Sequence, residues 1–335
     1  MSLPDPTPIL DLIEGFRRSK TMFTAVSMGI FDRLHDAPAS AANLALGANP
    51  DALERLLDAC AALGLLRKIE GVYRNEPVAD AYLRSASPDS FSGYIGYSDQ
   101  ALYAMWGHLD DAVREGSHRW NQTFGWEGPI FSSFFRTDDA MRVFLRGMHG
   151  FGTLTSPRVV EAFDLSRFRR VVDLGGASGH LAIAACERYP GLQGVVLDLP
   201  RVAEFAREQV ALSPAADRIQ VVEGDFFADE LPPADLYAVG QILHDWSEEK
   251  IGTLLRKIVE KLPAGGALLV VEKLLNEDGV GPLAANMQSL NMLIVTEGKE
   301  RSLTEYSRLL KLAGFGTVEG CRTGVRLDAV LATKD

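Results

Sequence analysis

From about residue 170 onward, short aliphatic runs alternate with stretches of helical spacing. The runs typical of buried strands are RRVVDLG, GVVLDL, RIQVVEGD, ADLYAVGQIL, GALLVVE and VRLDAVLATK. Helical stretches such as HLAIAACERYP and EEKIGTLLRKIVEKL lie between them. Because strands that alternate with helices form parallel sheets covered on both faces, the sequence predicts a Rossmann-like, doubly wound α/β domain.

Residues that directly follow these strands are the candidates for a binding site. In open parallel sheets the ligand sits beyond the carboxyl ends of the strands, where the first residues of each following loop converge. This rule selects Gly175, Asp198, Asp225, His244 and Glu272. We therefore expect these five residues to lie along one edge of the sheet.

The first strand ends in a glycine-rich loop, VVDLGGASGHLA, with glycines at 175, 176 and 179. Glycines let the backbone turn tightly and approach a ligand, and the helix that follows presents free N–H groups. The dinucleotide fingerprint G-x-G-x-x-G is not met, because Ala177 separates Gly176 from Ser178. Taken alone, the loop is either part of a ligand site or a structural turn from strand to helix.

The next two strands end in acidic residues. Asp198, in VVLDLP, stands where a carboxylate would meet ribose hydroxyls, although it could instead cap the helix that follows. Asp225, in EGDFF, could accept a hydrogen bond from an adenine amino group, and Phe226 could cover one face of the ring. Alternatively, Phe226 is simply an aromatic residue of the core. Together with the glycine loop, these features indicate an adenosyl ligand that needs no pyrophosphate.

His244, in VGQILHDW, follows the fourth aliphatic run. It is either a buried structural imidazole or a base at the end of a strand, and strand-end loops beside a ligand site favour the base. Two neighbouring acids have plain alternatives as well, since Glu272 could be a solvated charge and Asp245 a helix cap. If His244 is a base, His244→Ala should lower turnover while folding survives.

The first hundred residues read mainly as helix. One helix is predicted over LIEGFRRSKTMFTAVSMGIFDRL and a second over DALERLLDACAALGLL, followed by a hairpin around Glu70 and Gly71. This order is that of a winged helix. The second helix carries Asp51, Glu54 and Asp58 and is net acidic, so we expect packing or dimerisation rather than DNA binding. The apolar stripe of FRRSKTMFTAVSMGIF is expected to be exposed and to join two subunits into a homodimer.

Composition excludes several classes of protein. The net charge of −11 would repel a nucleic-acid backbone. No apolar stretch approaches the roughly 20 residues that span a bilayer, and the N-terminus does not resemble a signal peptide, so we expect a cytoplasmic protein that does not bind membranes. The three cysteines Cys60, Cys186 and Cys321 lie far apart and indicate neither disulfides nor a metal site. The expected domains are residues 1–100 and 101–335, with a nucleotide-binding core over about 165–335.

Several motifs together resemble the caffeate-type (class I) S-adenosylmethionine-dependent O-methyltransferases, and within them the acetylserotonin O-methyltransferase branch. These are VVDLGGASG, VVLDLP, EGDFF, LHDW, WGHLDDAVREG and SLNMLIVTEGKERSLTEYSRLLKLAGF. The resemblance implies an N-terminal region that interlocks two subunits and a C-terminal domain that binds S-adenosylmethionine. It implies cofactor contacts from Gly175, Gly176, Asp198, Asp225 and Phe226. It also implies that His244 is the general base, with Glu272 and Glu300 as its acidic partners.

The same resemblance places the methyl acceptor. Its walls would come from Met148, Trp106, Asn291 and Met292, although residues of these types are often plain helix packing. Two positions depart from the family. Gln241 lies where a Lys or Arg is common near the cofactor, and Val295 replaces a polar residue of the acetylserotonin enzymes.

Three functions are compatible with these residues. The first is methyl transfer to a hydroxyl of a small, aromatic molecule, because an imidazole with a pKa near 6.5 can take the proton of a phenol with a pKa of about 10. A carboxylate beside the imidazole would fix its tautomer. The second is hydroxylation or decarboxylation on the same scaffold, against which His244 and Glu300 argue. The third is a non-catalytic regulator that binds S-adenosylmethionine.

Overall fold

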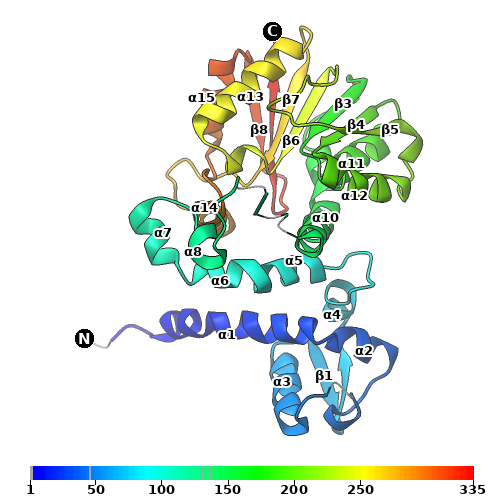
Figure 1. Ribbon diagram of the computed structural model, residues 1–335, viewed down its shortest axis with the longest axis vertical. Coiled ribbons are helices and arrows are strands. Elements are labelled where there is room, and N and C mark those ends of the chain that lie inside the picture. Colours follow the sequence, from blue (N-terminus) through cyan, green and yellow to red (C-terminus); the bar gives the residue numbers. More distant parts are fainter. Residues whose placement is uncertain (1–2, 45–46, 130–131, 134, 136) are drawn as a thin grey trace. The chain divides into compact units, whose positions relative to one another are not determined.

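The computed structural model describes residues 3–44, 47–129, 132–133, 135 and 137–335 (Figure 1). The chain forms two compact units, Met1–Tyr103 and Ala104–Asp335. The sequence places this division three residues earlier, after residue 100. None of the helices in the described ranges has the length and apolar character needed to cross a membrane.

The first unit is a small helical domain with a two-stranded hairpin. Its strands β1 and β2 pair antiparallel, and Ile69 stands opposite Val72 across a turn at Glu70 and Gly71, both of which have positive φ. Phe31, Leu57 and Tyr73 are fully buried in its core. The elements are α1 (Thr7–Ser27), α2 (Ile30–Asp36), η1 (Ala41–Asn43), α3 (Pro50–Ala62), β1 (Leu66–Ile69), β2 (Val72–Asn75), α4 (Pro77–Tyr82), α5 (Ser92–Tyr97) and the π-helix η2 (Ser98–Leu102).

The first predicted helix is in fact two helices. α1 ends at Ser27 and α2 begins at Ile30, because Gly29 adopts the left-handed conformation with φ 68°. The exposed apolar side chains also lie earlier than expected. Met22, Phe23 and Val26 pack against the core of the unit. The exposed apolar residues occupy the first turns of α1: Ile9, Leu10, Leu12, Ile13 and Phe16, each between 55% and 78% exposed.

The second unit contains a seven-stranded sheet with the order β5-β4-β3-β6-β7-β9-β8 (Figure 1). This arrangement confirms the predicted Rossmann-like α/β fold, but the sheet is not parallel throughout. Every neighbouring pair from β5 to β7 is parallel, but β9 runs antiparallel to both β7 and β8. The strands are β3 (Arg170–Leu174), β4 (Gln193–Asp198), β5 (Ile219–Glu223), β6 (Leu236–Gly240), β7 (Ala267–Glu272), β8 (Thr317–Cys321) and β9 (Asp328–Thr333).

Helices cover both faces of this sheet, because adjacent residues of a strand point to opposite sides. Val171 packs on the face covered by α10, α11 and α12, whereas Val172 packs on the face covered by α13 and α15. The helical elements that precede β3 are α6 (Tyr103–Trp106), α7 (Leu109–Glu115), α8 (Trp120–Phe124) and α10 (Asp138–Val160). Those that follow are α11 (His180–Arg188), α12 (Pro200–Ala211), η3 (Ala216–Arg218), η4 (Leu243–Asp245), α13 (Glu248–Lys261), α14 (Leu283–Val295) and α15 (Leu303–Ala313).

Candidate active site

A cavity of about 810 Å³ opens at the carboxyl ends of β3, β4, β5 and β6, within the second unit. The parallel strands bring their final residues to one edge of the sheet, as the sequence predicts. All six residues that the sequence assigns to the cofactor line this cavity: Gly175, Gly176, Asp198, Asp225, Phe226 and Gln241. The volume lies within the range of small-molecule and cofactor sites.

The glycine loop forms part of the cavity wall with its backbone. Gly175 has φ 68°, and a Cβ there would lie 2.6 Å from Cδ1 of Ile242. A Cβ on Gly176 would lie 2.7 Å from Oδ2 of Asp173. A side chain at either position would therefore force neighbouring side chains to move, and at Gly175 it would also strain the backbone. Ala177 also has a positive φ, 50°, which is unusual for a residue with a Cβ.

Asp198 ties the glycine loop to the end of β4. Its Oδ2 accepts a hydrogen bond from the N–H of Ala177 at 2.8 Å, and its Oδ1 accepts one from the N–H of Leu199 at 2.7 Å. Burial raises the pKa of Asp198 to about 6, although these two hydrogen bonds oppose the rise. The side chain does not cap α12, whose N-cap residue is Leu199.

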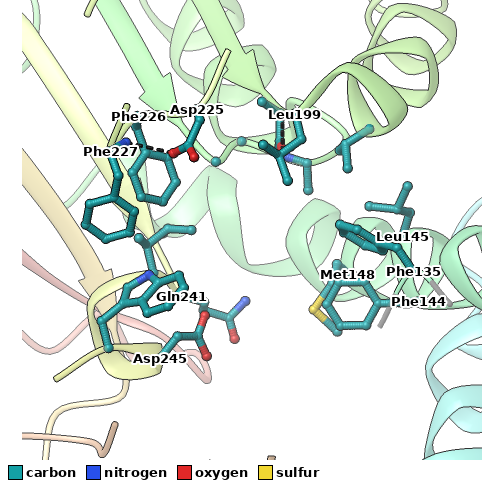
Figure 2. A pocket seen from close by; sticks show the side chains of 18 of the residues that line it. Phe135, Phe144, Leu145, Met148, Leu199, Asp225, Phe226, Phe227, Gln241 and Asp245 are labelled. Carbon is teal, nitrogen blue, oxygen red and sulfur yellow. Dashed lines mark hydrogen bonds between the residues drawn. The ribbon is translucent and has the colours of Figure 1, made fainter. Parts of the chain in front are cut away.

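Aromatic side chains stand beside Asp225 at the end of β5. The carboxylate of Asp225 accepts a hydrogen bond from the N–H of Phe227 at 2.8 Å. The rings of Phe226 and Phe227 lie 4.8 Å apart, and Trp246 meets Phe227 edge-on at 5.2 Å. Figure 2 shows Asp225, Phe226 and Phe227 on one side of the cavity. This side therefore combines a hydrogen-bond acceptor with flat apolar surfaces.

The opposite side of the cavity is apolar. It carries Phe135, Phe144, Leu145 and Met148, three of them from α10 (Figure 2). Met148 is the one predicted acceptor residue that the structure brings to the cavity wall as described. The sequence did not single out the other three, because a helical pattern alone does not show which residues face a cavity.

The remaining predicted acceptor residues do not line this cavity. Trp106 donates its Nε1–H to Oδ1 of Asn291 at 3.0 Å, which joins α6 to α14. Met292 and Val295 are 4% and 1% exposed, and the carbonyl oxygen of Val295 accepts the indole N–H of Trp120 at 2.8 Å. The contacts of Trp106, Asn291 and Val295 join α14 to α6 and α8, and the role of these residues in acceptor binding stays a prediction.

His244 lies between two carboxylates. Its Nδ1 is 2.7 Å from Oε1 of Glu300 and 3.2 Å from Oε2 of Glu272. The imidazole is 5% exposed and both glutamate side chains are fully buried. These three residues do not line the cavity, but Asp245 does, and its Oδ1 lies 3.7 Å from Nε2 of His244. Nε2 is thus the ring nitrogen nearest to a residue of the cavity wall.

Glu272 also holds the turn that carries His244. Its Oε1 accepts hydrogen bonds from the N–H groups of Leu243 at 2.9 Å and Ile242 at 3.1 Å. Glu272 is therefore not a solvated strand-end charge. Asp245 is not the cap of α13 either, because Ser247 takes that position and accepts the N–H of Lys250.

The charges around His244 shift several pKa values. Burial is the largest single influence on His244 and lowers its pKa, but Glu272, Glu300 and Asp245 together outweigh burial and raise the pKa to about 10. Burial raises the pKa of Glu272 to about 7. One Nδ1–H cannot satisfy both carboxylates, and Oε2 of Glu272 and Oε2 of Glu300 have no hydrogen-bond partner among the described residues. The cluster therefore has room for a further proton or a cation: one ligand atom from each of the three side chains lies within 4.8 Å of the others.

Several polar residues of the cavity wall were not predicted from the sequence, among them Asp173 and His180. Asp173 is 2% exposed, burial raises its pKa to about 7, and its Oδ2 has no partner among the described residues. Its position near the end of β3, two residues before Gly175, is the signal that could have identified it. His180, the first residue of α11, also lines the cavity. Its role depends on long-range packing and could not be read from the sequence.

The cavity suits S-adenosylmethionine, a ligand with an adenosyl group and a cationic sulfur. The glycine loop leaves room for close approach of a ligand to the backbone. Asp198 and Asp225 offer acceptors, and the unpaired oxygen of Asp173 offers a negative charge in a buried position. The fold and this site define a methyltransferase.

Comparison with known proteins gives the family. The O-methyltransferase domain family matches residues 106–316, and the O-methyltransferase dimerisation domain matches residues 10–85. The chain is 41% identical to acetylserotonin O-methyltransferase of chicken (Gallus gallus), over 98% of this chain and 97% of that protein. The chain belongs to the O-methyltransferase family, and it is an S-adenosylmethionine-dependent enzyme.

Two human proteins extend the comparison. The crystal structure of human N-acetylserotonin methyltransferase in complex with S-adenosylmethionine matches with a TM-score of 0.94 and 38% identity, over 100% of this chain and 99% of that chain. A probable bifunctional dTTP/UTP pyrophosphatase/methyltransferase protein of Homo sapiens is 43% identical over 99% of this chain. This chain spans about half, 54%, of that protein's length.

Proposed function

We propose that this O-methyltransferase methylates a hydroxyl group of a small aromatic molecule, with His244 as the general base. The observation that carries the proposal is the 2.7 Å contact between Nδ1 of His244 and the buried carboxylate of Glu300. This contact leaves Nε2 on the side of Asp245, a residue of the cavity wall. An oriented imidazole beside a ligand cavity is the arrangement that general-base catalysis requires.

The cavity wall supports an aromatic acceptor. Phe135, Phe144, Leu145 and Met148 form an apolar side, and flat rings pack well against aromatic and thioether groups. Two of the relatives, the chicken and the human acetylserotonin methyltransferases, are named for acetylserotonin. We assign this chain the acceptor class rather than acetylserotonin itself, because Val295 is apolar and buried where the resemblance expects a polar side chain.

Residues of the chain hold both reactants. Asp198 would bind the ribose hydroxyls and Asp225 the adenine amino group, while Phe226 covers the ring. Bound S-adenosylmethionine supplies a methyl group on a positively charged sulfur. As the acceptor oxygen forms its bond to that methyl carbon and the carbon–sulfur bond breaks, the hydroxyl proton passes to Nε2 of His244. The Glu300 carboxylate stabilises the resulting imidazolium.

The raised pKa of His244 suits a phenolic acceptor. An unperturbed phenol has a pKa of about 10, close to the pKa of about 10 that the surrounding carboxylates give His244. Proton transfer between two groups of similar pKa costs little free energy. The carboxylates around His244 thus make the imidazole a stronger base than a free histidine.

The direct test is a product analysis. The protein is incubated with S-adenosylmethionine labelled in its methyl group and with a panel of phenols, and the products are identified by mass spectrometry. We expect label on the acceptor oxygen and release of S-adenosylhomocysteine. A hydroxylated or decarboxylated product, or cofactor binding without any product, would reject the proposal in favour of the other uses of the scaffold.

The pH profile tests the electrostatic role of Glu272. Only the imidazole that has lost its Nε2 proton can act as base, so kcat/KM should rise with pH until about the pKa of His244. Glu272→Gln removes one of the three carboxylates that raise this pKa, and it keeps an amide oxygen for the N–H groups of Ile242 and Leu243. The rise should therefore move to lower pH in the variant. The same acceptor is used for both proteins, so that its own ionisation does not shift; an unmoved profile would refute this role of Glu272.

We also propose that the enzyme is a homodimer joined through α1. The matched dimerisation domain supports this, and so do the exposed apolar residues in the first turns of the helix, among them Ile13 at 57% and Phe16 at 55% exposure. Burying such a patch across a two-fold axis removes apolar surface from water.

Charges on this face of α1 should separate the subunits. Light scattering should give the mass of two chains for the wild type and of one chain for the double variant Ile13→Glu, Phe16→Glu. Leu212→Glu changes a residue that is 81% exposed in the second unit, and it should leave the mass unchanged. A monomeric wild type at micromolar concentration would contradict the proposal.

A further inference from the structure

His180 stands at a point where the cavity meets two helices. It is the first residue of α11 and follows directly on Gly179 of the glycine loop. Its Nδ1 lies 2.8 Å from Oγ of Ser156, which belongs to α10. Its other ring nitrogen, Nε2, has no hydrogen-bond partner among the described residues, and the side chain lines the cavity.

The backbone of α10 fixes the position of this ring. A Cβ on Gly152 would lie 2.3 Å from Cγ and Cδ2 of His180 and 2.5 Å from Nδ1. The imidazole therefore lies directly against the helix at a residue that has no side chain. Packing against Gly152 and the contact of Nδ1 to Ser156 together restrain the orientation of the ring. Since Nδ1 is engaged by Ser156, Nε2 is the ring nitrogen that remains for a ligand in the cavity.

The charges of the cavity wall suggest a role for Nε2 of His180. The described wall contains five carboxylates and one ammonium group, Lys250, which is paired with Glu297. S-adenosylmethionine carries an amino-acid group with both an ammonium and a carboxylate. Buried Asp173 suits the ammonium, but a ligand carboxylate in so acidic a cavity needs a hydrogen-bond donor. The donor has to come from a neutral group, since the wall has no unpaired cation among its described residues.

We propose that Nε2–H of His180 donates a hydrogen bond to the carboxylate of the cofactor's amino-acid group. This inference rests on the proposed placement of the adenosyl group against Asp198 and Asp225, which leaves the other end of the cofactor for the start of α11. The N-terminus of that helix favours a negative charge as well. His180 is thus a positioning residue that selects cofactors with an intact amino-acid group.

The surroundings of His180 determine its protonation state. Burial, together with His149, lowers the pKa of His180 to about 4, so the ring is neutral at physiological pH. A neutral imidazole has one N–H. With the proton on Nε2, Nδ1 accepts a hydrogen bond from the hydroxyl group of Ser156, and Nε2–H is free to donate a hydrogen bond to the ligand.

Calorimetry with two ligands isolates this contact. S-adenosylhomocysteine has the complete amino-acid group, and its decarboxylated analogue, 5′-deoxy-5′-(3-aminopropylthio)adenosine, keeps the amine and lacks the carboxylate. His180→Ala should weaken binding of S-adenosylhomocysteine by about 10- to 100-fold, the usual range for a hydrogen bond to a charged group, and leave the analogue's Kd unchanged. His180→Gln, which keeps an N–H donor, should recover part of the loss.

His149→Ala is the matched control. His149 also lies on α10 and contacts Ser178 of the glycine loop at 2.9 Å, but it does not line the cavity. Any effect of this change should be the same for both ligands. Thermal melts show which variants fold; if His180→Ala does not, His180→Phe keeps a ring against Gly152, lacks both nitrogens and gives the same comparison.

The outcomes separate this inference from the proposed function. If the His180 variants weaken the binding of both ligands equally, or of neither, the ring does not bind the ligand carboxylate and the inference is wrong. If the wild type binds neither ligand, the placement of the cofactor itself fails. Loss confined to S-adenosylhomocysteine establishes the contact without any measurement of turnover.

Discussion

Replacing His244 with asparagine should lower the turnover number by about 10²- to 10⁴-fold, the range for loss of a positioned general base. Asparagine keeps an N–H donor near the position of Nδ1, so it can still meet Glu300, but it has no basic nitrogen near the position of Nε2. Because His244 does not line the cavity, the Kd of S-adenosylhomocysteine should change little. Single-turnover methyl transfer and calorimetry measure the two effects separately.

Asparagine is a better probe than alanine. His244→Ala would leave Glu272 and Glu300 buried together without the imidazole, and breaking a buried charge pair in this way costs about 3–5 kcal/mol. The sequence-based expectation that the alanine variant folds normally is therefore revised. Near-normal turnover in His244→Asn, or a loss that only follows thermal unfolding, would make the imidazole structural.

Replacing Glu300 with glutamine should lower turnover by about 100-fold or more. The amide can still contact Nδ1 but carries no negative charge to stabilise the imidazolium, and it can turn its N–H₂ group toward the ring and favour the wrong tautomer. Glu272→Gln should have the smaller effect on turnover, because Glu272 lies 3.2 Å from Nδ1 whereas Glu300 lies 2.7 Å away.

The control for this series is Glu319→Gln, a change of an exposed residue on the outer strand β8. Its turnover should equal that of the wild type. If Glu272→Gln slowed methyl transfer more than Glu300→Gln, the assignment of Glu300 as the principal partner of His244 would be wrong.

The sequence predicts the cofactor side of the cavity well, and the reason is geometric. Strand ends are easy to find in a chain of aliphatic runs, and parallel strands carry their ends to one edge. Asp198 and Asp225, which are 27 residues apart, reach the same cavity for this reason alone. The pairing of His244 with Glu300, 56 residues away, came instead from the family resemblance, and the structure brings these two residues together.

Helices are harder to read than strand ends. The spacing of apolar residues shows that a helix has a buried face, but it does not show whether that face meets a cavity or another helix. Met148 on α10 faces the cavity, whereas Met292 on α14 is packed away from it.

The outer strands pose a similar difficulty. β8 is short, mostly exposed and contains Gly320, so it gives a weak pattern, and the reversed direction of β9 depends on contacts with β7 that the sequence does not show.

Contacts within the protein itself support the shape of the glycine loop. Ala177 is held at a positive φ while its N–H is bonded to Asp198, so the backbone strain of this residue is already compensated within the protein. Little conformational entropy remains to be lost in the loop when a ligand enters, and more of the interaction free energy appears as affinity. Because the product S-adenosylhomocysteine has the same adenosyl and amino-acid groups as the substrate, we expect the loop to favour product binding as well as substrate binding.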